Sequence, residues 1–306
     1  MGIVVIGATF VDIKGFPKDV YLPTGRNVGR IEYIHGGVAR NLVEDIANVE
    51  LRPTFLSIVD DTPLGTDVLQ KLKNHKVNVD YVRTIPDGMG TWLAVFDNNG
   101  DVAGSISKRP NMLPVLDLLE EKGDEIFSQA DSAVIEVDID KEIVKKVLEL
   151  CEKHGKKVFG LVSNMSIAAE RRDLLRRYTC FICNQQEAGQ LFMDDYSEKT
   201  PEEMQDILAD RLPKAEIPSM VVTMGAQGAV YADLQGNKGL CPARNVRVKD
   251  TTGAGDAFCA GVAIGLTYGK SLAQAIDIGT TLAASVITSS ENVCPRFQPA
   301  EFGLEL

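Results

Sequence analysis

Short, almost purely apolar runs alternate with longer segments of helical periodicity along most of the chain. The apolar runs are rich in Val and Ile and have the length of β-strands. We expect strands at Ile3–Ala8, Thr54–Val59, Thr91–Phe96, Ala133–Val137, Lys157–Leu161, Thr179–Cys183, Met220–Thr223 and Ala229–Ala232. Near-continuous apolar strands are typical of a parallel sheet that is covered on both faces.

The segments between these runs have the apolar spacing of amphipathic helices. They predict helices at Val38–Asn48, Gly65–His75, Val115–Phe127, Lys141–His154, Pro201–Leu212, Gly255–Leu266 and Ser271–Ile287. In the last of these, Ser271 fits an N-cap. Alternation of strands and helices predicts a doubly wound α/β sheet, mostly parallel, with helices on both faces. Such sheets bind ligands at the carboxyl ends of their strands.

Two stretches, 10–35 and 92–108, lack helical periodicity and contain Gly, Pro and Asn turns. We interpret them as small β insertions that form a lid over the main sheet. With no linker, repeat or low-complexity run, residues 1–306 are expected to form a single domain with these insertions.

The charge balance of the chain disfavours nucleic acids and acidic membranes as binding partners. The 306 residues carry 32 Lys and Arg against 43 Asp and Glu, a net charge of −11, which repels nucleic acids and acidic membranes. No apolar run reaches the roughly 18 residues of a membrane helix. The six cysteines have no paired spacing, so a cytoplasmic location is expected. A phosphate ligand would therefore have to be bound by local groups, such as backbone amides without a hydrogen-bond partner.

The segment with the strongest chemical signal is Lys249-Asp-Thr-Thr-Gly-Ala-Gly-Asp-Ala-Phe258. Small residues at 253–255 open an apolar helix, whose first amides lack intrahelical partners and carry the positive end of the helix dipole. Such a turn can hold a phosphoryl group, and Asp256 could accept a proton from an attacking hydroxyl. The alternative is a Gly-rich loop with an acidic residue in the first helical turn.

Three further segments also have two explanations each. His35-Gly-Gly-Val-Ala-Arg-Asn41 suits close approach of a ligand, or is a polar turn before a helix. Asn184-Gln-Gln-Glu187 offers a carboxylate for hydrated Mg²⁺, or is a helix cap with Glu at the third position. Thr223-Met-Gly-Ala-Gln-Gly228 is explained by a hairpin, and matters for function only if it faces Asp256.

Several other chemistries lack support. Cys180 and Cys183 would face opposite sides of a strand, which disfavours a zinc site. The sequence has no H-E-x-x-H or G-x-S-x-G pattern, and no G-x-G-x-x-G follows the first strand. Metalloproteases, serine hydrolases and nicotinamide-dependent oxidoreductases are therefore disfavoured.

Taken in order, these motifs resemble the ribokinase family of small-molecule kinases, also called the phosphofructokinase-B type. Gly36-Gly37 with Asn41 is similar to its N-terminal signature, and Asp250-Thr-Thr-Gly-Ala-Gly-Asp256 to its C-terminal one. The segments at 184–187 and 223–228 match two intermediate motifs. The resemblance covers essentially the whole chain and implies a ribokinase-like fold and an ATP- and Mg²⁺-dependent kinase.

The resemblance also implies roles for individual residues. Asp256 would be the catalytic base, beside an anion hole formed by the amides of Gly253, Ala254 and Gly255. Glu187 and Asn184 would organise Mg²⁺ through water. The remaining residues fall into three sets: Asp12, Gly36, Gly37 and Asn41 at the acceptor; Thr223, Gly225 and Gly228, with Asn184 and Glu187, at ATP; Asp250 and Thr252 at a monovalent cation such as K⁺.

Within the family, the segments around Gly36 and Thr91-Trp-Leu-Ala-Val-Phe-Asp97 are most similar to pseudouridine kinases. This predicts phosphorylation of the 5′-hydroxyl of pseudouridine, with ribokinase or another sugar or nucleoside kinase as alternatives, and a catalytically silent binding protein as the non-enzyme alternative. The family also implies a homodimer through the lid. Glu44-Asp45 and Ser107-Lys-Arg-Pro-Asn111 depart from the usual pattern.

Overall fold

The larger of two sheets forms the centre of the molecule, in a computed structural model that describes residues 2–305. Its strand order is β13-β12-β11-β10-β9-β8-β1-β4-β5. The strands from β5 to β11 in this order are parallel, β12 runs antiparallel to β11, and β13 runs antiparallel to β12. The bounds are β1 Ile3–Ile6, β4 Thr54–Val59, β5 Val82–Thr84, β8 Ser132–Glu136, β9 Lys157–Leu161, β10 Cys180–Asn184, β11 Ser219–Thr223, β12 Ala229–Asp233 and β13 Lys238–Cys241.

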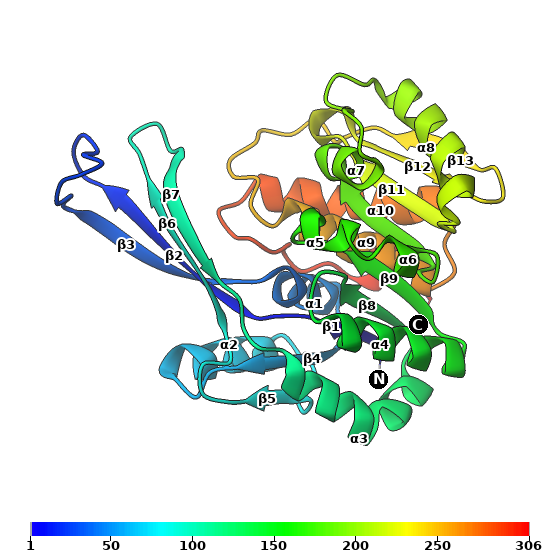
Figure 1. Ribbon diagram of the computed structural model, residues 1–306, viewed down its shortest axis with the longest axis horizontal. Helices are drawn as coiled ribbons and strands as arrows, with labels where there is room; N and C mark the ends of the chain where they lie inside the picture. Colours follow the sequence, from blue (N-terminus) through cyan, green and yellow to red (C-terminus); the bar gives the residue numbers. More distant parts are fainter. Residues whose placement is uncertain (1, 306) are drawn as a thin grey trace.

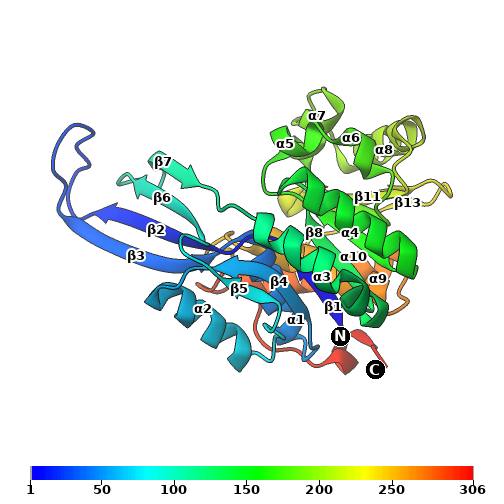
Figure 2. The same ribbon diagram turned by 60° about the horizontal axis from the view of Figure 1, so that its bottom comes forward.

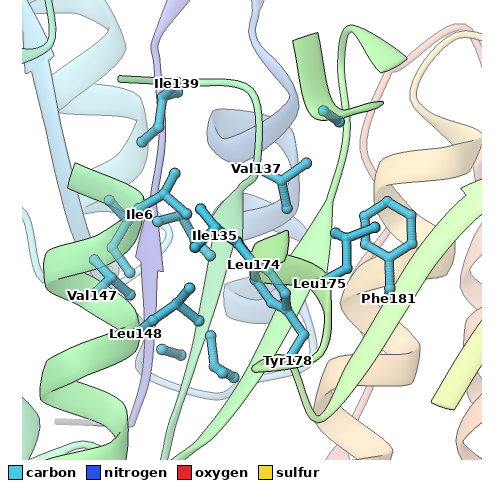
Figure 3. Packing of buried hydrophobic residues seen from close by; sticks show 14 of the residues in the cluster. Ile6, Ile135, Val137, Ile139, Val147, Leu148, Leu174, Leu175, Tyr178 and Phe181 are labelled. Carbon is cyan, nitrogen blue, oxygen red and sulfur yellow. The ribbon is translucent and has the colours of Figure 1, made fainter. Parts of the chain in front are cut away.

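Helices cover both faces of this sheet (Figures 1 and 2). One layer contains α3 Leu113–Gln129, α4 Lys141–His154, α5 Met165–Ala169, α6 Arg172–Leu175, α7 Gln185–Phe192 and α8 Pro201–Ala215. The opposite layer contains α1 Val38–Asn48, α2 Pro63–Asn74, α9 Ala254–Thr267 and α10 Leu272–Ile287. Side chains of β1 alternate between the layers: Val4 and Ile6 pack into the first, Ile3 and Val5 into the second. Figure 3 shows Ile6 and Ile135 meeting Val147 and Leu148 of α4. The predicted doubly wound α/β sheet is confirmed.

A second sheet of four strands extends to one side of this body (Figure 1). Its order is β3-β2-β6-β7, with bounds β2 Phe10–Pro17, β3 Gly29–Gly36, β6 Gly90–Phe96 and β7 Val102–Lys108. The register aligns one face from strand to strand. That face carries the exposed side chains of Ile31, Tyr33, Leu93, Val95 and Ile106, named here the apolar sheet face.

Most predicted bounds lie within three residues of the observed ones, and the differences have local causes. The first strand ends at Ile6, not Ala8, because the N–H of Ala8 donates to the carboxylate of Glu136 and not to a neighbouring strand. Ser271 caps α10 as predicted, in a capping box with Gln274. The sequence patterns did not predict β5, β13, α5 and α6, which have three to five residues each, and they indicated α7 only through the alternative of a cap at Asn184.

Among residues 2–305, no helix combines the length and the apolar character that crossing a bilayer requires.

Candidate active site

Polar residues gather where the parallel strands of the larger sheet end. Asn184, the last residue of β10, lies opposite Thr223, the last residue of β11. Glu136 ends β8, and its carboxylate accepts from Ala39 in the first turn of α1. Helix α9 also begins at this edge, because Asp256 in its first turn contacts Asn41 of α1. These strand ends and two helix starts therefore surround one site, as expected for a doubly wound sheet.

The central contact of this site joins two segments that are far apart in the chain. Asn41 Nδ2 donates a hydrogen bond of 2.7 Å to Asp256 Oδ2, across a sequence separation of 215 residues. Burial raises the pKa of Asp256 to about 6, although the bond from Asn41 and the charge of Arg40 both lower it. The carboxylate is therefore mostly ionised at neutral pH and can still accept a proton.

Asp12 lies beside this pair. A Cβ added to Gly36 would come within 2.6 Å of Asp12 Oδ1, so the carboxylate rests directly on this glycine. Burial raises the pKa of Asp12, and the charge of Asp12 in turn raises the pKa of Asp256. In β6, Trp92 is the register partner of Asp12 and shares its face of the sheet. The structure thus brings Asp12, Gly36, Asn41 and Asp256 together.

The start of α9 has the features of an anion-binding turn. Gly253 adopts a φ of +81°, and a Cβ at this residue would lie 2.0 Å from the carbonyl oxygen of Asn292. A Cβ at Gly255 would meet no atom within 4 Å, so the space in front of it is open. The amides of Gly253, Gly255 and Asp256 have no hydrogen-bond partner among the described residues. They carry the positive end of the helix dipole, which favours an anion.

Ala254 departs from the expected set of free amides. Its N–H donates to the carbonyl oxygen of Thr251 at 3.2 Å and closes the turn before the helix. Asp250 and Thr252 form another contact in this turn, in which Asp250 Oδ1 accepts from the amide of Thr252 at 2.8 Å. That bond lowers the pKa of Asp250. The three residues therefore stabilise the loop that presents Gly253 and Gly255.

Asn184 and Glu187 form the helix cap that the sequence offered as the alternative to a Mg²⁺ site. Asn184 Oδ1 accepts from the amide of Glu187, and Glu187 Oε2 accepts from the amide of Asn184, both at 2.8 Å. Burial raises the pKa of Glu187. Burial raises the pKa of Cys259 in α9, and the charges of Asp256 and Glu187 raise this pKa further. The cap thus leaves Glu187 within electrostatic reach of the first turns of α9.

The segment 223–228 forms the predicted hairpin between β11 and β12. Gly228 has a φ of +96°, and a Cβ there would lie 2.1 Å from the carbonyl oxygen of Cys241, so only glycine fits. Gly225 has a φ of +56° and faces open space. The turn is therefore tight on one side and accessible on the other, next to Asn184.

The side chains of the site suit a hydrated metal ion better than one held entirely by protein ligands. Within residues 2–305, no group of three or more His, Cys, Asp or Glu side chains is arranged to hold an ion. Mg²⁺ usually keeps several waters and binds through one or two carboxylates together with substrate phosphates. Glu187 fits that mode, because it supplies one carboxylate whose charge, like that of Asp256 in the first turn of α9, acts on the thiol of Cys259.

Four buried polar groups of the site were not singled out from the sequence. Glu136 accepts from the amides of Ala8 at 3.2 Å and Ala39 at 2.8 Å, and burial raises its pKa to about 8. Asp138 accepts from Ser163 and from Arg109. Arg40 and Asn292 both donate to Asn41. A carboxylate at the end of an apolar strand was the available signal for Glu136.

The contact of Arg109 with Asp138 also explains the unusual segment 107–111, since it joins the end of β7 to the larger sheet.

Comparisons with known proteins agree with this architecture. The sequence profile of the "pfkB family carbohydrate kinase" group matches residues 2–294. A guanosine-inosine kinase from Exiguobacterium acetylicum is 37% identical over 95% of this chain and 95% of its own. The pseudouridine kinase of Escherichia coli is 25% identical over 90% of this chain and 86% of its own. Arabidopsis thaliana ribokinase, solved with ribose and ATP, superposes with a TM-score of 0.85 at 20% identity, covering 99% of this chain and 98% of that one.

Proposed function

The chain belongs to the pfkB family of carbohydrate kinases and is an ATP-dependent sugar or nucleoside kinase, and we propose that its acceptor is the 5′-hydroxyl of a purine nucleoside such as guanosine or inosine. The 37% identity to a guanosine-inosine kinase supports this acceptor. Pseudouridine, the acceptor expected from the sequence motifs, has the weaker support of 25% identity and is kept as the alternative.

The observation that carries the proposed chemistry is the hydrogen bond between Asn41 and Asp256 at the open start of α9. Asp256 would accept the proton of the attacking hydroxyl. A pKa of about 6 suits this role, because the group is ionised at neutral pH yet basic enough to help. General-base catalysis of this kind contributes about 10²–10⁴-fold to the rate.

The transferred phosphoryl group would be held by the amides of Gly253 and Gly255, with the amide of Asp256 in place of that of Ala254, which bonds to Thr251. Thr223, Gly225 and Gly228 would line the ATP site next to Asn184. When bound through water to Glu187 and the phosphates, Mg²⁺ would supply positive charge that stabilises the γ-phosphoryl oxygens. Asp250 and Thr252 keep their proposed place at a monovalent cation such as K⁺.

The acceptor would be gripped by Asp12, by Asn41 and by the backbone of Gly36 and Gly37. Trp92 supports a nucleoside over a free sugar. It stands next to Asp12 on the same sheet face, so a base attached to a ribose held by Asp12 could stack on its indole. Stacking of a base on an aromatic ring contributes about 1–3 kcal/mol.

The four-stranded sheet would act as a lid that excludes water during transfer. We also propose that the apolar sheet face forms a homodimer contact. Its side chains of Ile31, Tyr33 and Ile106 are 60–70% exposed, which is unusual for residues of this size on one continuous surface. A cytoplasmic location and the absence of a nucleic-acid or membrane partner stay predictions from composition.

ADP release tests the proposal directly. The purified protein, with ATP and Mg²⁺, is offered guanosine, inosine, pseudouridine, uridine, adenosine and ribose under identical conditions. The highest kcat/KM with guanosine or inosine would support the proposal, and a preference for pseudouridine or ribose would overturn the purine assignment.

Binding without turnover is the non-enzyme alternative, and the protein's single tryptophan can detect it. Guanosine should quench the fluorescence of Trp92 and ribose should not. Quenching without ADP release for any acceptor would favour a binding protein.

A further inference from the structure

A buried ion pair lies directly behind the central contact of the site. Arg40 and Glu44, one turn apart on α1, are both fully buried. Arg40 Nη1 donates to Glu44 Oε2, and Nη2 donates to the carbonyl oxygen of His35 and to Asn41 Oδ1. A guanidinium holds such a geometry well, because its five donors are fixed in one plane.

These bonds determine which way the side-chain amide of Asn41 points. Its Oδ1 accepts from Arg40 and, at 3.2 Å, from Asn292 Nδ2. Since the oxygen is engaged on this side, Nδ2 is the atom left to donate to Asp256. With the amide turned over, its oxygen would face the carboxylate and its NH₂ group would face the guanidinium, and both contacts would be repulsive.

Glu44 holds Arg40 in place and balances its charge. Apart from Arg40, its carboxylate faces Lys71 Nζ at 3.2 Å and His75 Nε2 at 3.8 Å, both from the region of α2. A chain of contacts thus runs from Glu44 through Arg40 and Asn41 to Asp256. Burying an ion pair seldom adds stability over an apolar pair of similar size, so stability alone gives little reason for this one.

From this geometry we infer that Arg40, held by Glu44, is a positioning residue of the kinase: it fixes the amide of Asn41 so that Asp256 is kept in place for its proposed role as base. The inference rests on the proposed function. It concerns two residues of this chain, Arg40 and Glu44, that touch neither acceptor nor nucleotide in that proposal.

The electrostatics of the site add a second effect. Several titratable groups lie within electrostatic reach of Asp256: Asp12 of β2, Glu136 of β8, Arg40 and Asp45 of α1, and Cys259 of α9. Of these, only Arg40 is positive. The charge of Arg40 and the bond from Asn41 both lower the pKa of Asp256, so losing Arg40 should raise this pKa above about 6. The acid limb of the kcat/KM profile should then move to higher pH.

The test uses a double variant, Arg40→Met with Glu44→Leu, which removes both buried charges together and leaves neither unpaired. A second variant, Arg40→Lys, keeps a positive charge but loses the forked guanidinium. The control is Arg177→Met with Glu152→Leu, which removes a two-bond Arg–Glu pair on the surface. Asp256→Asn is assayed beside them.

For the double variant we expect kcat to fall on the order of 10–100-fold, as for loss of supporting contacts behind a reacting group, with the KM for ATP unchanged. The pH at which kcat/KM falls on the acid side of its profile should be higher in the double variant than in the wild type. Arg40→Lys should lower kcat and shift this pH by less. The surface control should match the wild type in both measurements.

A folded double variant with wild-type kcat and an unmoved acid limb would overturn the inference. If the double variant does not fold, Arg40→Lys decides: lowered kcat at constant ATP KM supports the inference, and unchanged kcat overturns it. The proposed function fails separately, if Asp256→Asn keeps its activity.

Discussion

Replacing Asp256 by Asn should inactivate the enzyme and stabilise its fold at the same time. Asn has almost the shape of Asp, and its amide oxygen can still accept the bond from Asn41 that Asp256 Oδ2 accepts now. What the variant removes is the half-buried negative charge and the ability to take a proton. We therefore expect kcat to fall on the order of 10²–10⁴-fold, with little change in ATP binding.

The size of the stability gain follows from the pKa of Asp256. Burial raises this pKa from the ordinary 3.8 to about 6, so the fold disfavours the ionised carboxylate. The difference corresponds to roughly 3 kcal/mol at most. Because the residue is partly exposed, solvent screening reduces it, and about 1–2 kcal/mol is the expected gain in unfolding free energy at pH 8.

The gain should depend on pH in a defined direction. Below about pH 3 the carboxyl is mostly protonated in both the folded and the unfolded protein, so the charge contributes almost nothing to the difference. As pH rises from about 4 through 6, the unfolded carboxyl ionises freely and the folded one does so only at a cost. The advantage of the Asp256→Asn variant over the wild type should therefore appear across this range and level off above it.

Urea unfolding of both proteins at pH 4, 6 and 8, with ADP release measured on the same samples, tests these two expectations. Glu136 and Asp45 do not cancel between the two proteins, because the charge of Asp256 contributes to the raised pKa of both carboxyls. Losing that charge makes their ionisation less costly in the folded variant, which adds to the gain in the same direction. Near-wild-type kcat would remove Asp256 from the role of base. A variant that is less stable than the wild type at pH 8 would show that the carboxylate is stabilised by its contacts, against the reasoning from burial.

The remaining predictions concern other parts of the site. Asp12→Ala should raise the KM for the nucleoside about 10–150-fold and leave the KM for ATP unchanged, because it removes hydrogen bonds worth about 1.5–3 kcal/mol. A change in the ATP KM alone would contradict the place of Asp12 at the acceptor. Gly253→Ala should lower the melting temperature, because its Cβ would lie 2.0 Å from the carbonyl oxygen of Asn292. Gly255→Ala should fold normally and lose turnover, and equal melting temperatures of the two variants would refute the contrast. Ile106→Glu should shift a dimer to monomer in sedimentation velocity, with Ser105→Glu on the opposite face as control, and a wild-type monomer would exclude the dimer.

The sequence was informative where local rules determine structure. The strands β4 and β9 and the helices α1 and α4 begin and end where their apolar patterns do. The same holds for caps, because a cap depends on residues three positions apart, as in Asn184 with Glu187. Elements of three to five residues, such as β5 and α6, contain too few positions to establish a period, and they form because neighbouring elements pack on them.

In the candidate site, too, the residues with a local sequence signal could be predicted and those placed by long-range contacts could not. Glycines with special backbone geometry leave a local signal, so Gly253 and Gly228 could be identified as turn residues. Arg40 gave no such signal, since an arginine inside an amphipathic helix is ordinarily a surface residue. Its burial arises from the carbonyl oxygen of His35, the side chain of Asn41 and the carboxylate of Glu44, which only the folded chain brings around it.

The two halves of the site depend on each other for a physical reason. Asp256 is placed by the start of α9, and that start is shaped by Gly253 packing on the carbonyl oxygen of Asn292. The side chain of Asn292 also donates to Asn41 Oδ1 and to the carbonyl oxygen of His35. The same asparagine therefore sets both the turn that would receive phosphate and the amide that holds Asp256. A shift in the loop after α10 would displace the anion-binding turn and the carboxylate together, so that neither could be repaired by adjusting the other alone.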